Sequence, residues 1–467
     1  WASNVFGYGV TNYTNLYPNI DLVFYSVNES LKYDFNVKPF ANPSEIKLKY
    51  NGVENIKISK GRLIIQTSIN KIIEGKPYAY QTINGVITEV ACEYVLTGKT
   101  LSFRFPNGYN KNLQLVIDPT LIFSTFSGST SNNFGYTATF DRDGFLYSGS
   151  TAFGLLYPTT IGAYDVTWNA GRVDVAISKY DTTGTFMVYS TFIGGTNDEL
   201  PHSMITNSKD ELFIYGTTSS TDFPFTTGCY DSTFNGGTPL SLLSGLGVNF
   251  TNGSDIFVIK LSQAGDSLMA GTFFGGTGND GLNSTPINEL RYNYADEVRG
   301  EIEIDKNDNI YVVSCTRSTD IPTLTGAYQS IHGGGDLDGC IFKMDNKLTT
   351  LIWSSYLGGS NDDAIYSVAL DKNDNAYVVG GTNSINFPFT SGAISNSFSG
   401  IRADGFITKF NTTGTSVLKS TYYGSDVYDQ IYFVELDRND SVFVYGQTEK
   451  MDSSLGAITK VILSLLV

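Results

Sequence analysis

The sequence has 467 residues, of which 41% are hydrophobic and 13% aromatic, so it is long enough for roughly two or three folded domains. Its 48 glycines, 30 tyrosines and 30 phenylalanines against 5 methionines are typical of β structure with many turns. The net charge of −16 argues against nucleic acid or an anionic membrane as a partner. No apolar run approaches the ~18 residues that a membrane-spanning helix needs.

Residues 1–117 do not repeat, and short segments within them alternate apolar with polar side chains, as at 20–25, 31–37 and 101–105. A two-residue period over many short runs, separated by Asn-Gly and Gly turns, indicates antiparallel strands with one solvent-facing side. We therefore predict an antiparallel β-sandwich over 1–117, followed by a joint at 118–120. Because the chain starts at Trp1 without a signal-like segment, we expect a mature or trimmed piece.

The remaining residues, 118–467, are organised around one recurring stretch, Asp371–Thr382. It begins with Asp-Lys-Asn-Asp-Asn, whose residues tolerate positive φ and bond their own backbone, and it continues with the strand pattern Ala-Tyr-Val-Val. The stretch returns at 305–316 and 437–448, and in weaker form at 207–218 and 141–151. Five copies of a hairpin predict a repeat protein.

Each repeat contains four predicted strands, and tandem four-stranded units predict a β-propeller. Asp305, Asp371 and Asp437 are spaced 66 residues apart, whereas the wider gap between Asn207 and Asp305 holds two insertions, near 239–253 and 281–297. We predict an all-β chain, in which the sandwich is followed by five four-stranded blades. The units lie near 134–193, 200–275, 297–357, 364–423 and 430–467, and the strand 121–127 completes the last blade. A solenoid, or a longer native chain with more blades, are the alternatives.

The sequence offers little catalytic chemistry. It has two histidines, His202 and His332, which fall in different units, and it lacks the Gly-x-Ser-x-Gly, HExxH and P-loop motifs. Acidic residues recur at matching positions in each unit, whereas a catalytic pair would occur once, in the central cavity. Cys315 and Cys340 fall at facing strand ends and are predicted to be two buried thiols, with a disulfide as the alternative. We therefore predict no enzyme activity.

The recurring turn has one further interpretation, which is a calcium site. Oxygen-bearing side chains at alternate positions suit a hard cation. The turn lacks the glycine and the bidentate glutamate of an EF-hand, and a polar hairpin turn explains the same residues. We therefore favour the turn, require no cofactor, and keep calcium as the alternative. The candidate ligands are Asp305, Asn307, Asn309, Asp371, Asn373, Asn375, Asp437 and Asn439.

The two insertions are predicted to meet on one rim of the propeller, because each connection follows a strand that runs in the same direction. Both insertions are rich in large apolar residues, which we expect to form an exposed partner-binding patch. The alternative is a packed bulge that covers a blade edge. The candidate binding residues are Leu242, Leu243, Leu246, Phe250, Leu290, Tyr292 and Tyr294.

The repeats resemble the SBBP-type β-propeller repeat of bacterial surface proteins. The resemblance rests on Ser-Thr-Tyr/Phe-x-Gly-Gly-x-Asn-Asp, on the recurring stretch itself, and on Phe-Pro-x-Thr-x-Gly-Ala. The segments 17–25 and 33–39 resemble the domain that commonly precedes such repeats. The family name refers to seven blades, and the five units counted here depart from that.

The resemblance implies a secreted or cell-surface protein of Bacteroidota, at the extracellular or outer-membrane surface of a Gram-negative bacterium. It implies export by the type IX secretion system, or membership of a surface assembly, with the outer-membrane secretion machinery as one candidate partner. We expect a non-enzymatic protein that presents loops to a protein or glycan. The alternative is a polysaccharide-active propeller hydrolase or lyase.

Overall fold

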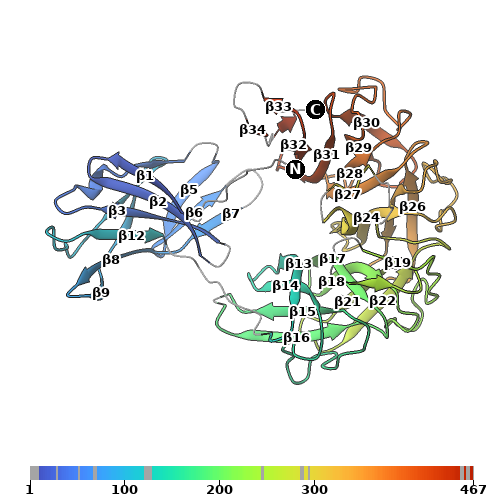
Figure 1. Cartoon of the computed structure of the whole chain (residues 1–467), viewed down its shortest axis with the longest axis horizontal. Helices are drawn as coiled ribbons and strands as arrows, with labels where there is room; N and C mark the ends of the chain where they lie inside the picture. Colours follow the sequence, from blue (N-terminus) through green and yellow to red (C-terminus); the bar gives the residue numbers. More distant parts are fainter. Residues whose placement is uncertain are drawn as a thin grey trace. The chain divides into compact units, whose positions relative to one another are not determined.

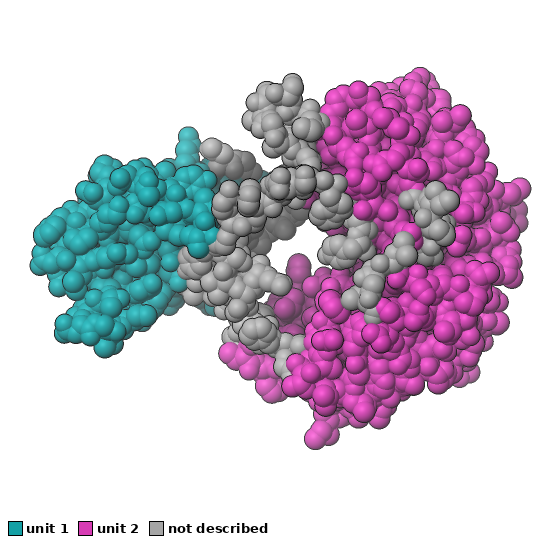
Figure 2. Space-filling model, in the orientation of Figure 1, with its two compact units in different colours: residues 1–125 teal, residues 126–467 magenta. Residues whose placement is uncertain are grey.

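The computed structural model of the chain describes residues 10–27, 30–50, 53–66, 71–119, 129–182, 184–242, 247–283, 289–292, 295–452, 457–458 and 463–465. The chain divides into two compact units, Trp1–Thr125 and Phe126–Val467, which Figure 2 colours separately. In the described part the only helical elements are two 3-10 turns, η1 (Pro43–Glu45) and η2 (Asp296–Val298). No helix within these ranges is long and apolar enough to cross a membrane.

Unit 1 consists of three antiparallel sheets. The largest has the strand order β1 (Val10–Tyr17), β2 (Ile20–Val27), β3 (Ser30–Val37), β12 (Leu115–Pro119), β8 (Pro77–Ile83) and β9 (Val86–Glu89). The second has the order β10 (Glu93–Thr97), β11 (Thr100–Arg104) and β4 (Leu48–Lys49). The third is a meander of β5 (Asn55–Ser59), β6 (Arg62–Gln66) and β7 (Lys71–Glu74).

The three sheets of unit 1 share one hydrophobic core. Its fully buried members include Phe35 on β3, Leu63 on β6 and Leu101 on β11, one from each sheet. The alternation of apolar and polar residues along the strands places these side chains on the inner faces. The predicted antiparallel β fold of the N-terminal region is thus confirmed.

Unit 2 is a succession of antiparallel sheets, which we call blades 1 to 5 (Figure 1). Blade 1 contains β13 (Asn133–Phe140), β14 (Leu146–Ala152), β15 (Asp174–Tyr180) and β16 (Met187–Ile193). Blade 2 contains β17 (Glu199–Thr206), β18 (Leu212–Thr218), β21 (Asp255–Leu261) and β22 (Leu268–Phe274). Blade 3 contains β23 (Glu301–Ile304), β24 (Ile310–Thr316), β25 (Asp338–Met344) and β26 (Leu351–Leu357).

The last two blades follow the same order. Blade 4 contains β27 (Asp363–Leu370), β28 (Ala376–Thr382), β29 (Asp404–Phe410) and β30 (Val417–Tyr423). The described strands of blade 5 are β31 (Asp429–Leu436), β32 (Val442–Thr448) and β35 (Leu463–Leu465). Two small hairpins, β19 (Leu240–Ser241) with β20 (Asn249–Phe250) and β33 (Met451–Asp452) with β34 (Ala457–Ile458), lie outside the blade sheets.

The first strand of each blade is its inner strand, and consecutive inner strands pack together: β13 with β17, β17 with β23, β23 with β27, and β27 with β31. The chain therefore builds a β-propeller, as the repeat predicts. The proposed closing strand, residues 121–127, lies outside the described residues, so the way the ring closes stays a prediction.

Candidate functional site

The recurring turn that was a candidate for calcium is saturated with hydrogen-bond donors. Asp305 Oδ1 accepts from the backbone N–H groups of Asn307 (2.8 Å) and Asn309 (2.9 Å). Its Oδ2 accepts from Lys343 Nζ (2.8 Å) and from the Asn309 side-chain amide (3.0 Å). Although burial opposes it, the Lys343 ammonium and these amides hold the pKa of Asp305 below its ordinary value.

The other turns repeat this arrangement. Asp371 pairs with Lys409 (2.8 Å) and Asp141 with Lys179 (3.0 Å), while Asp437 Oδ1 accepts backbone N–H groups. Donors around a carboxylate repel a cation, because a hard cation needs oxygen lone pairs instead. The donor sets of Asp305 and Asp371 therefore do not suit calcium, whereas at Asp437, for which the described residues supply no lysine partner, the calcium alternative stays a prediction. Asn307, Asn309, Asn373, Asn375 and Asn439 belong to the hairpin turns.

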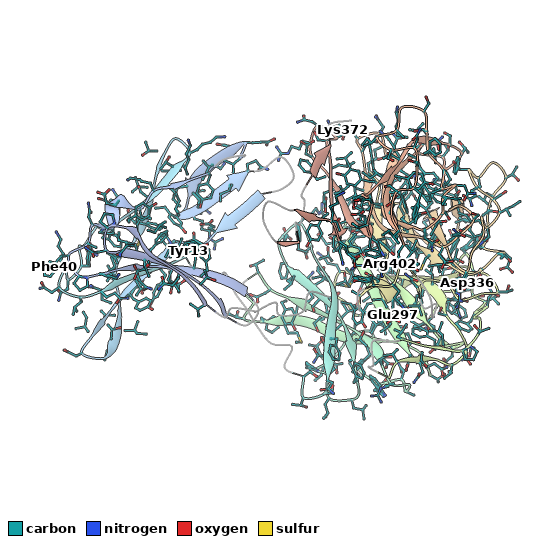
Figure 3. All side chains as sticks on the ribbon, turned by 45° about the horizontal axis from the view of Figure 1, so that its top comes forward. Tyr13, Phe40, Glu297, Asp336, Lys372 and Arg402 are labelled. Carbon is teal, nitrogen blue, oxygen red and sulfur yellow. The ribbon has the colours of Figure 1, made fainter. Side chains whose placement is uncertain are left out.

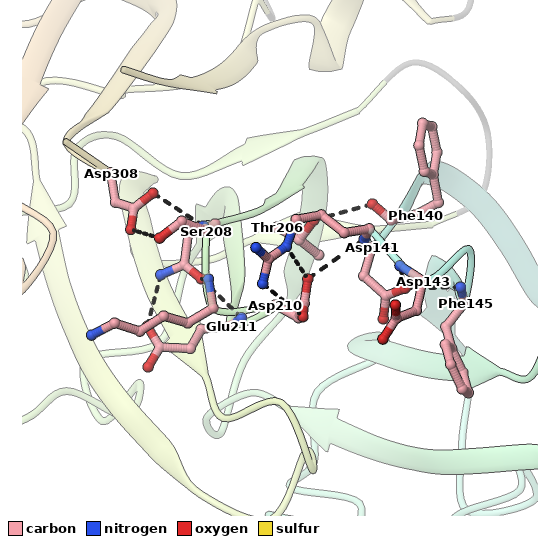
Figure 4. A network of polar contacts seen from close by, with 12 residues as sticks. Phe140, Asp141, Asp143, Phe145, Thr206, Ser208, Asp210, Glu211 and Asp308 are labelled. Carbon is pink, nitrogen blue, oxygen red and sulfur yellow. Dashed lines mark hydrogen bonds and ion pairs between the residues drawn. The ribbon is translucent and has the colours of Figure 1, made fainter. Parts of the chain in front are cut away.

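The same turns also tie neighbouring blades together (Figure 4). The second turn residue of each blade bonds the fourth turn residue of the next. Arg142 pairs with Asp210 (3.1 Å), and the Ser208 hydroxyl donates to Asp308 (2.6 Å). Lys306–Asp374 (2.8 Å) and Lys372–Asp440 (3.8 Å) continue the series. Repetition of charged residues in this sequence thus reflects contacts between blades.

The first insertion is packed rather than exposed. Leu242 and Phe250, predicted as partner-binding residues, are 6% and 0% exposed. They form one apolar cluster with Val173 of blade 1, Leu200 of blade 2 and Leu282 of the second insertion. The two insertions therefore meet, as predicted, but through buried side chains. The apolar residues served to pack the loop, which is why the expectation of an exposed patch is wrong for these two. Leu243 and Leu246 lie outside the described residues.

The second insertion packs across the later blades. Leu290 is fully buried in a cluster with Cys315 of blade 3, Tyr366 of blade 4 and Tyr428 of blade 5. Its carbonyl accepts from Tyr366 Oη (3.3 Å) and Gln430 Nε2 (3.0 Å). Leu290 was predicted to be an exposed partner-binding residue, and because it is buried, that expectation is wrong for it as well. Tyr292 is half-buried against the same cluster, and Tyr294 lies outside the described residues.

Charged groups hold the second insertion in place. Arg402, in the loop between the second and third strands of blade 4, stacks over the rings of Tyr292 (4.7 Å) and Tyr428 (4.9 Å). Arg291 pairs with Glu297 (3.3 Å), and both side chains are at least nine-tenths buried; Figure 3 labels Glu297 and Arg402. We call the described parts of the two insertions, together with Val298 and Arg299, which follow the second one, the cap; its residues are 239–242, 247–253, 281–283, 289–292 and 295–299.

Beside the cap, the inner strands enclose a cavity of about 670 Å³, which we call the central channel. Its lining includes residues from β13, β17, β23, β27 and β31, so the inner strand of every blade contributes. A second cavity of about 450 Å³ shares Tyr136, His202 and Tyr366 with the first and is also lined by Leu242 and Val298 of the cap. The cap and the channel are therefore contiguous.

Three glutamates line or approach this channel, and the sequence analysis did not single them out. Glu301 and Glu303 are on β23, and Glu435 is on β31. Burial, with a contribution from the Glu435 charge, raises the pKa of Glu301 to about 7 and that of Glu303 to about 8. Burial also raises the pKa of Glu435. Glu303 and Glu435 precede their turn aspartates by two residues, where blade 4 has Ala369. A glutamate at a repeat position where blade 4 has alanine is the sequence signal that could have identified Glu303 and Glu435.

The histidines and cysteines have structural surroundings. His202 Nε2 lies 3.0 Å from Thr217 Oγ1, and burial lowers the pKa of His202 to about 3, so the ring is neutral. His332 packs edge-on against Tyr356. Cys315 and Cys340 are both buried free thiols, which corrects the disulfide alternative.

Two family models match parts of the chain. One, described as "Domain of unknown function (DUF7948)", matches residues 1–120, and the other, described as "Beta-propeller repeat" (SBBP), matches residues 352–388. The resemblance to SBBP repeats is thereby confirmed for one stretch of unit 2. No curated protein shows significant similarity to the sequence.

Solved structures show only distant likeness. A protein of unknown function from Dyadobacter fermentans is 11% identical, with a TM-score of 0.35 over 69% of this chain and 76% of that one. A GH43_1 enzyme from Xanthomonas citri is 9% identical, with a TM-score of 0.29 over 71% and 92%. The Hadza microbial sialidase Hz136 is 7% identical, with a TM-score of 0.33 over 89% and 60%.

Proposed function

We propose that the chain is a non-enzymatic binding protein of the extracellular or outer-membrane surface of a Gram-negative bacterium, and that its central channel binds a glycan segment. The observation that carries the proposal is the composition of the channel wall. Carboxylates, hydroxyls and aromatic rings line one cavity of about 670 Å³, within the usual size of small-ligand sites.

The wall chemistry suits a carbohydrate. Glu303 and Glu435 offer oxygens to sugar hydroxyls, and Thr137 and Ser203 offer further donors and acceptors. Phe433, which is 51% exposed, presents an apolar ring on which a sugar face can stack. Because burial raises the pKa of Glu303 to about 8, its carboxyl group can donate as well as accept hydrogen bonds.

Hydrolysis would need two carboxyl groups in opposite protonation states, with environments that separate their pKa values. In the channel all three glutamates are shifted in the same direction. Glu301 is also engaged in the scaffold, because its Oε2 accepts from the backbone N–H of Val368 in blade 4 (2.9 Å). These two features favour binding over turnover.

A second candidate function is a polysaccharide-active hydrolase or lyase. One observation favours it: the pKa of Glu303 is raised to about 8, as a general acid requires. On this alternative Glu303 donates a proton to the leaving oxygen, and Glu435 serves as the base.

Binding and turnover can be measured on the same variants. We expect the wild-type chain to bind some members of a panel of neutral and acidic polysaccharides without releasing reducing or unsaturated ends. Glu303→Ala and Glu435→Ala, which remove the hydrogen-bonding groups, should weaken binding by about tenfold, the loss expected for one polar contact worth about 1.4 kcal/mol. Glu89→Ala, on the exposed strand β9 of unit 1, is the matched control. Turnover that Glu303→Ala abolishes would favour the hydrolase, and no binding to any glycan would contradict the channel site.

A protein partner would use another surface. The loops between the second and third strands expose large apolar side chains in successive blades, such as Ile161 in blade 1, Phe225 in blade 2, Ile331 in blade 3 and Ile401 in blade 4. Such exposed residues are typical of partner contacts.

We further propose export by the type IX system, so loss of that system in the native host should retain the protein inside the cell envelope.

A further inference from the structure

Buried carboxyl groups meet at the junctions between blades. One acid opens the third strand of a blade, and the other opens the inner strand of the next blade. The pairs are Asp174 with Glu199, Asp338 with Asp363, and Asp404 with Asp429. The third-strand acids are fully buried, as are Glu199 and Asp363, and Asp429 is 7% exposed.

The two acids of each pair flank one glycine. A Cβ placed on Gly194 would lie 2.7 Å from Glu199 Oε2 and 3.0 Å from Asp174 Oδ1. A Cβ on Gly358 would lie under 3.0 Å from both Asp338 Oδ1 and Asp363 Oδ2, and one on Gly424 would lie between Asp404 Oδ1 and Asp429 Oδ2. One oxygen of each acid therefore lies beside the same glycine at three junctions.

The two oxygens have unequal surroundings. Asp363 Oδ2 accepts from the Gly359 N–H (2.6 Å) and the Ser384 hydroxyl (2.8 Å). Asp338 Oδ2 accepts from the Gly333 N–H (2.5 Å), but Asp338 Oδ1 has no hydrogen-bond partner in the described part of the chain. Asp174 Oδ1 and Asp404 Oδ1 likewise have none there. Asp363 Oδ1 also has none there, so the difference lies in the two oxygens beside Gly358: two donors stabilise a negative charge on Asp363 Oδ2, whereas Asp338 Oδ1 is bare.

We propose that at each of these three junctions the two acids share one proton, which at Gly358 is carried on the bare Oδ1 of Asp338 and donated to the Asp363 carboxylate, so that the blades are joined by an acid–carboxylate hydrogen bond. Two buried anions around one glycine would repel each other strongly. A bridging divalent cation is the competing explanation, but the N–H and hydroxyl donors around the inner-strand acid do not suit one.

The junction at Gly358 has other titratable neighbours. His332 Nδ1 lies 3.7 Å from Asp338 Oδ2, and Asp362 lies beside Asp363. Arg317 contacts Asp336 at 3.7 Å on the outer side of the same loop. The Asp174 junction faces Asp165 and Asp198. None of these groups donates a hydrogen bond to the bare oxygens. A hydrogen bond at these oxygens therefore requires that one acid of the pair is itself protonated.

The pairs give the propeller a defined pH dependence. Burial and the Asp363 charge raise the pKa of Asp338 to about 8, and burial raises the pKa of Asp174 to about 7. Burial also raises the pKa of Asp363 to about 7 and that of Glu199 well above its usual range, so each pair holds a proton near neutrality. The folded state therefore binds more protons than the unfolded state between the ordinary aspartate pKa and these values. The stabilisation is fully present below the unfolded pKa and is lost as the pH rises through about 7 to 8.

The test compares Asp338→Asn with the wild type by urea unfolding of the full chain between about pH 5 and about pH 9. The asparagine amide is a permanent copy of the protonated acid, since its Nδ2–H can donate where Asp338 Oδ1 carries the proton. We expect similar midpoints at the acidic end and a higher midpoint for the variant at the alkaline end. Asp336→Asn, two residues earlier with a 69% exposed side chain, should follow the wild type.

Burial lowers the pKa values of His202 and His332, so their contribution to stability increases with pH, opposite to that of the acid pairs. Comparing each variant with the wild type at the same pH cancels this contribution. Should Asp338→Asn fail to fold, Asp174→Asn tests another junction, and the infrared difference between the wild type and Asp174→Asn at neutral pH should show a protonated-carboxyl band that the variant lacks. Equal destabilisation of the asparagine variants at every pH, or absence of that band, would overturn the proposal. A wild-type midpoint that rises with added calcium and falls with chelator would also overturn it, in favour of a bridging cation.

Discussion

At the scale of the residue, the first glycine of the Gly-Gly motif is required by the carboxylates around it. Gly358 leaves room for Asp338 and Asp363, which would both lie under 3.0 Å from a Cβ at that position. Added atoms at such a site force a shift in well-packed surroundings. The repeat therefore keeps glycine where two blades approach, and the motif reports an inter-blade contact.

We expect Gly358→Ala to lower the free energy of unfolding by about 1–3 kcal/mol, the usual loss on overpacking. Gly135→Ala, on β13, is the matched control because nothing lies within 4 Å of its Cβ position. Urea unfolding followed by tryptophan fluorescence reports on unit 2 through Trp168 and Trp353. Equal stabilities of the two variants would contradict the close approach of the acids to Gly358.

The buried ion pairs of the turns have a different pH dependence. Lys343→Met leaves Asp305 buried without its cation and should lower stability by about 3–5 kcal/mol. The double variant Asp305→Asn, Lys343→Met should lose less, because no buried charge is left unpaired. Since the pKa of Asp305 is depressed, the wild-type advantage over Lys343→Met should be present above the unfolded pKa of Asp305 and be lost as the pH falls. An advantage independent of pH would contradict the assignment.

At the scale of the element, the two insertions act as packing elements of the cap. Leu290 contacts residues of three blades, and Phe250 contacts two. Because so many blades share these contacts, loss of one side chain should loosen several junctions together. Replacement of 242–250 by a Gly-Ser link, which an exposed loop would tolerate, should instead destabilise unit 2.

Leu290→Ala should lower the free energy of unfolding by about 2–5 kcal/mol, as for other buried leucines. Leu324→Ala is the control, because Leu324 is 42% exposed on a blade 3 loop and should change stability by less than about 0.5 kcal/mol. Denaturant titration of both variants measures the difference. A Leu290→Ala chain as stable as Leu324→Ala would show that the cap is dispensable for folding.

At the scale of the whole molecule, four junctions share the same ties between turns, but blade 1 has Gly144 where later blades have the acceptor aspartate. A tie of this kind from blade 5 back to blade 1 is therefore impossible. Closure must depend on other contacts, and the sequence places the strand 121–127 in that role.

Two truncated chains test the closure. A chain of residues 121–467 keeps the predicted closing strand, and a chain of 129–467 lacks it. We expect the second to unfold at lower denaturant concentration, with earlier hydrogen exchange in β31 and β32 of blade 5, because an open propeller exposes a strand edge. Identical unfolding and exchange of the two chains would rule out the closing strand.

The sequence by itself determined the repeat, the four-stranded units and the meeting of the insertions, because strand periodicity and turn chemistry are local properties of the chain. The recurring Asp-Lys-Asn-Asp turn was predicted correctly as a turn. Only the tertiary structure showed that its aspartates pair with lysines about 40 residues away, such as Asp305 with Lys343, because that contact depends on the register of strands far apart in sequence.

Tertiary structure also decided which apolar and acidic residues face inward. Composition could not distinguish the buried Leu290 from an exposed binding residue, since a loop is hydrophobic in both cases. Likewise Glu303 and Glu435 became neighbours of one channel only when blades 3, 4 and 5 curved around it. Local patterns specify strands and turns, whereas burial and pKa values depend on what the rest of the chain brings against each side chain.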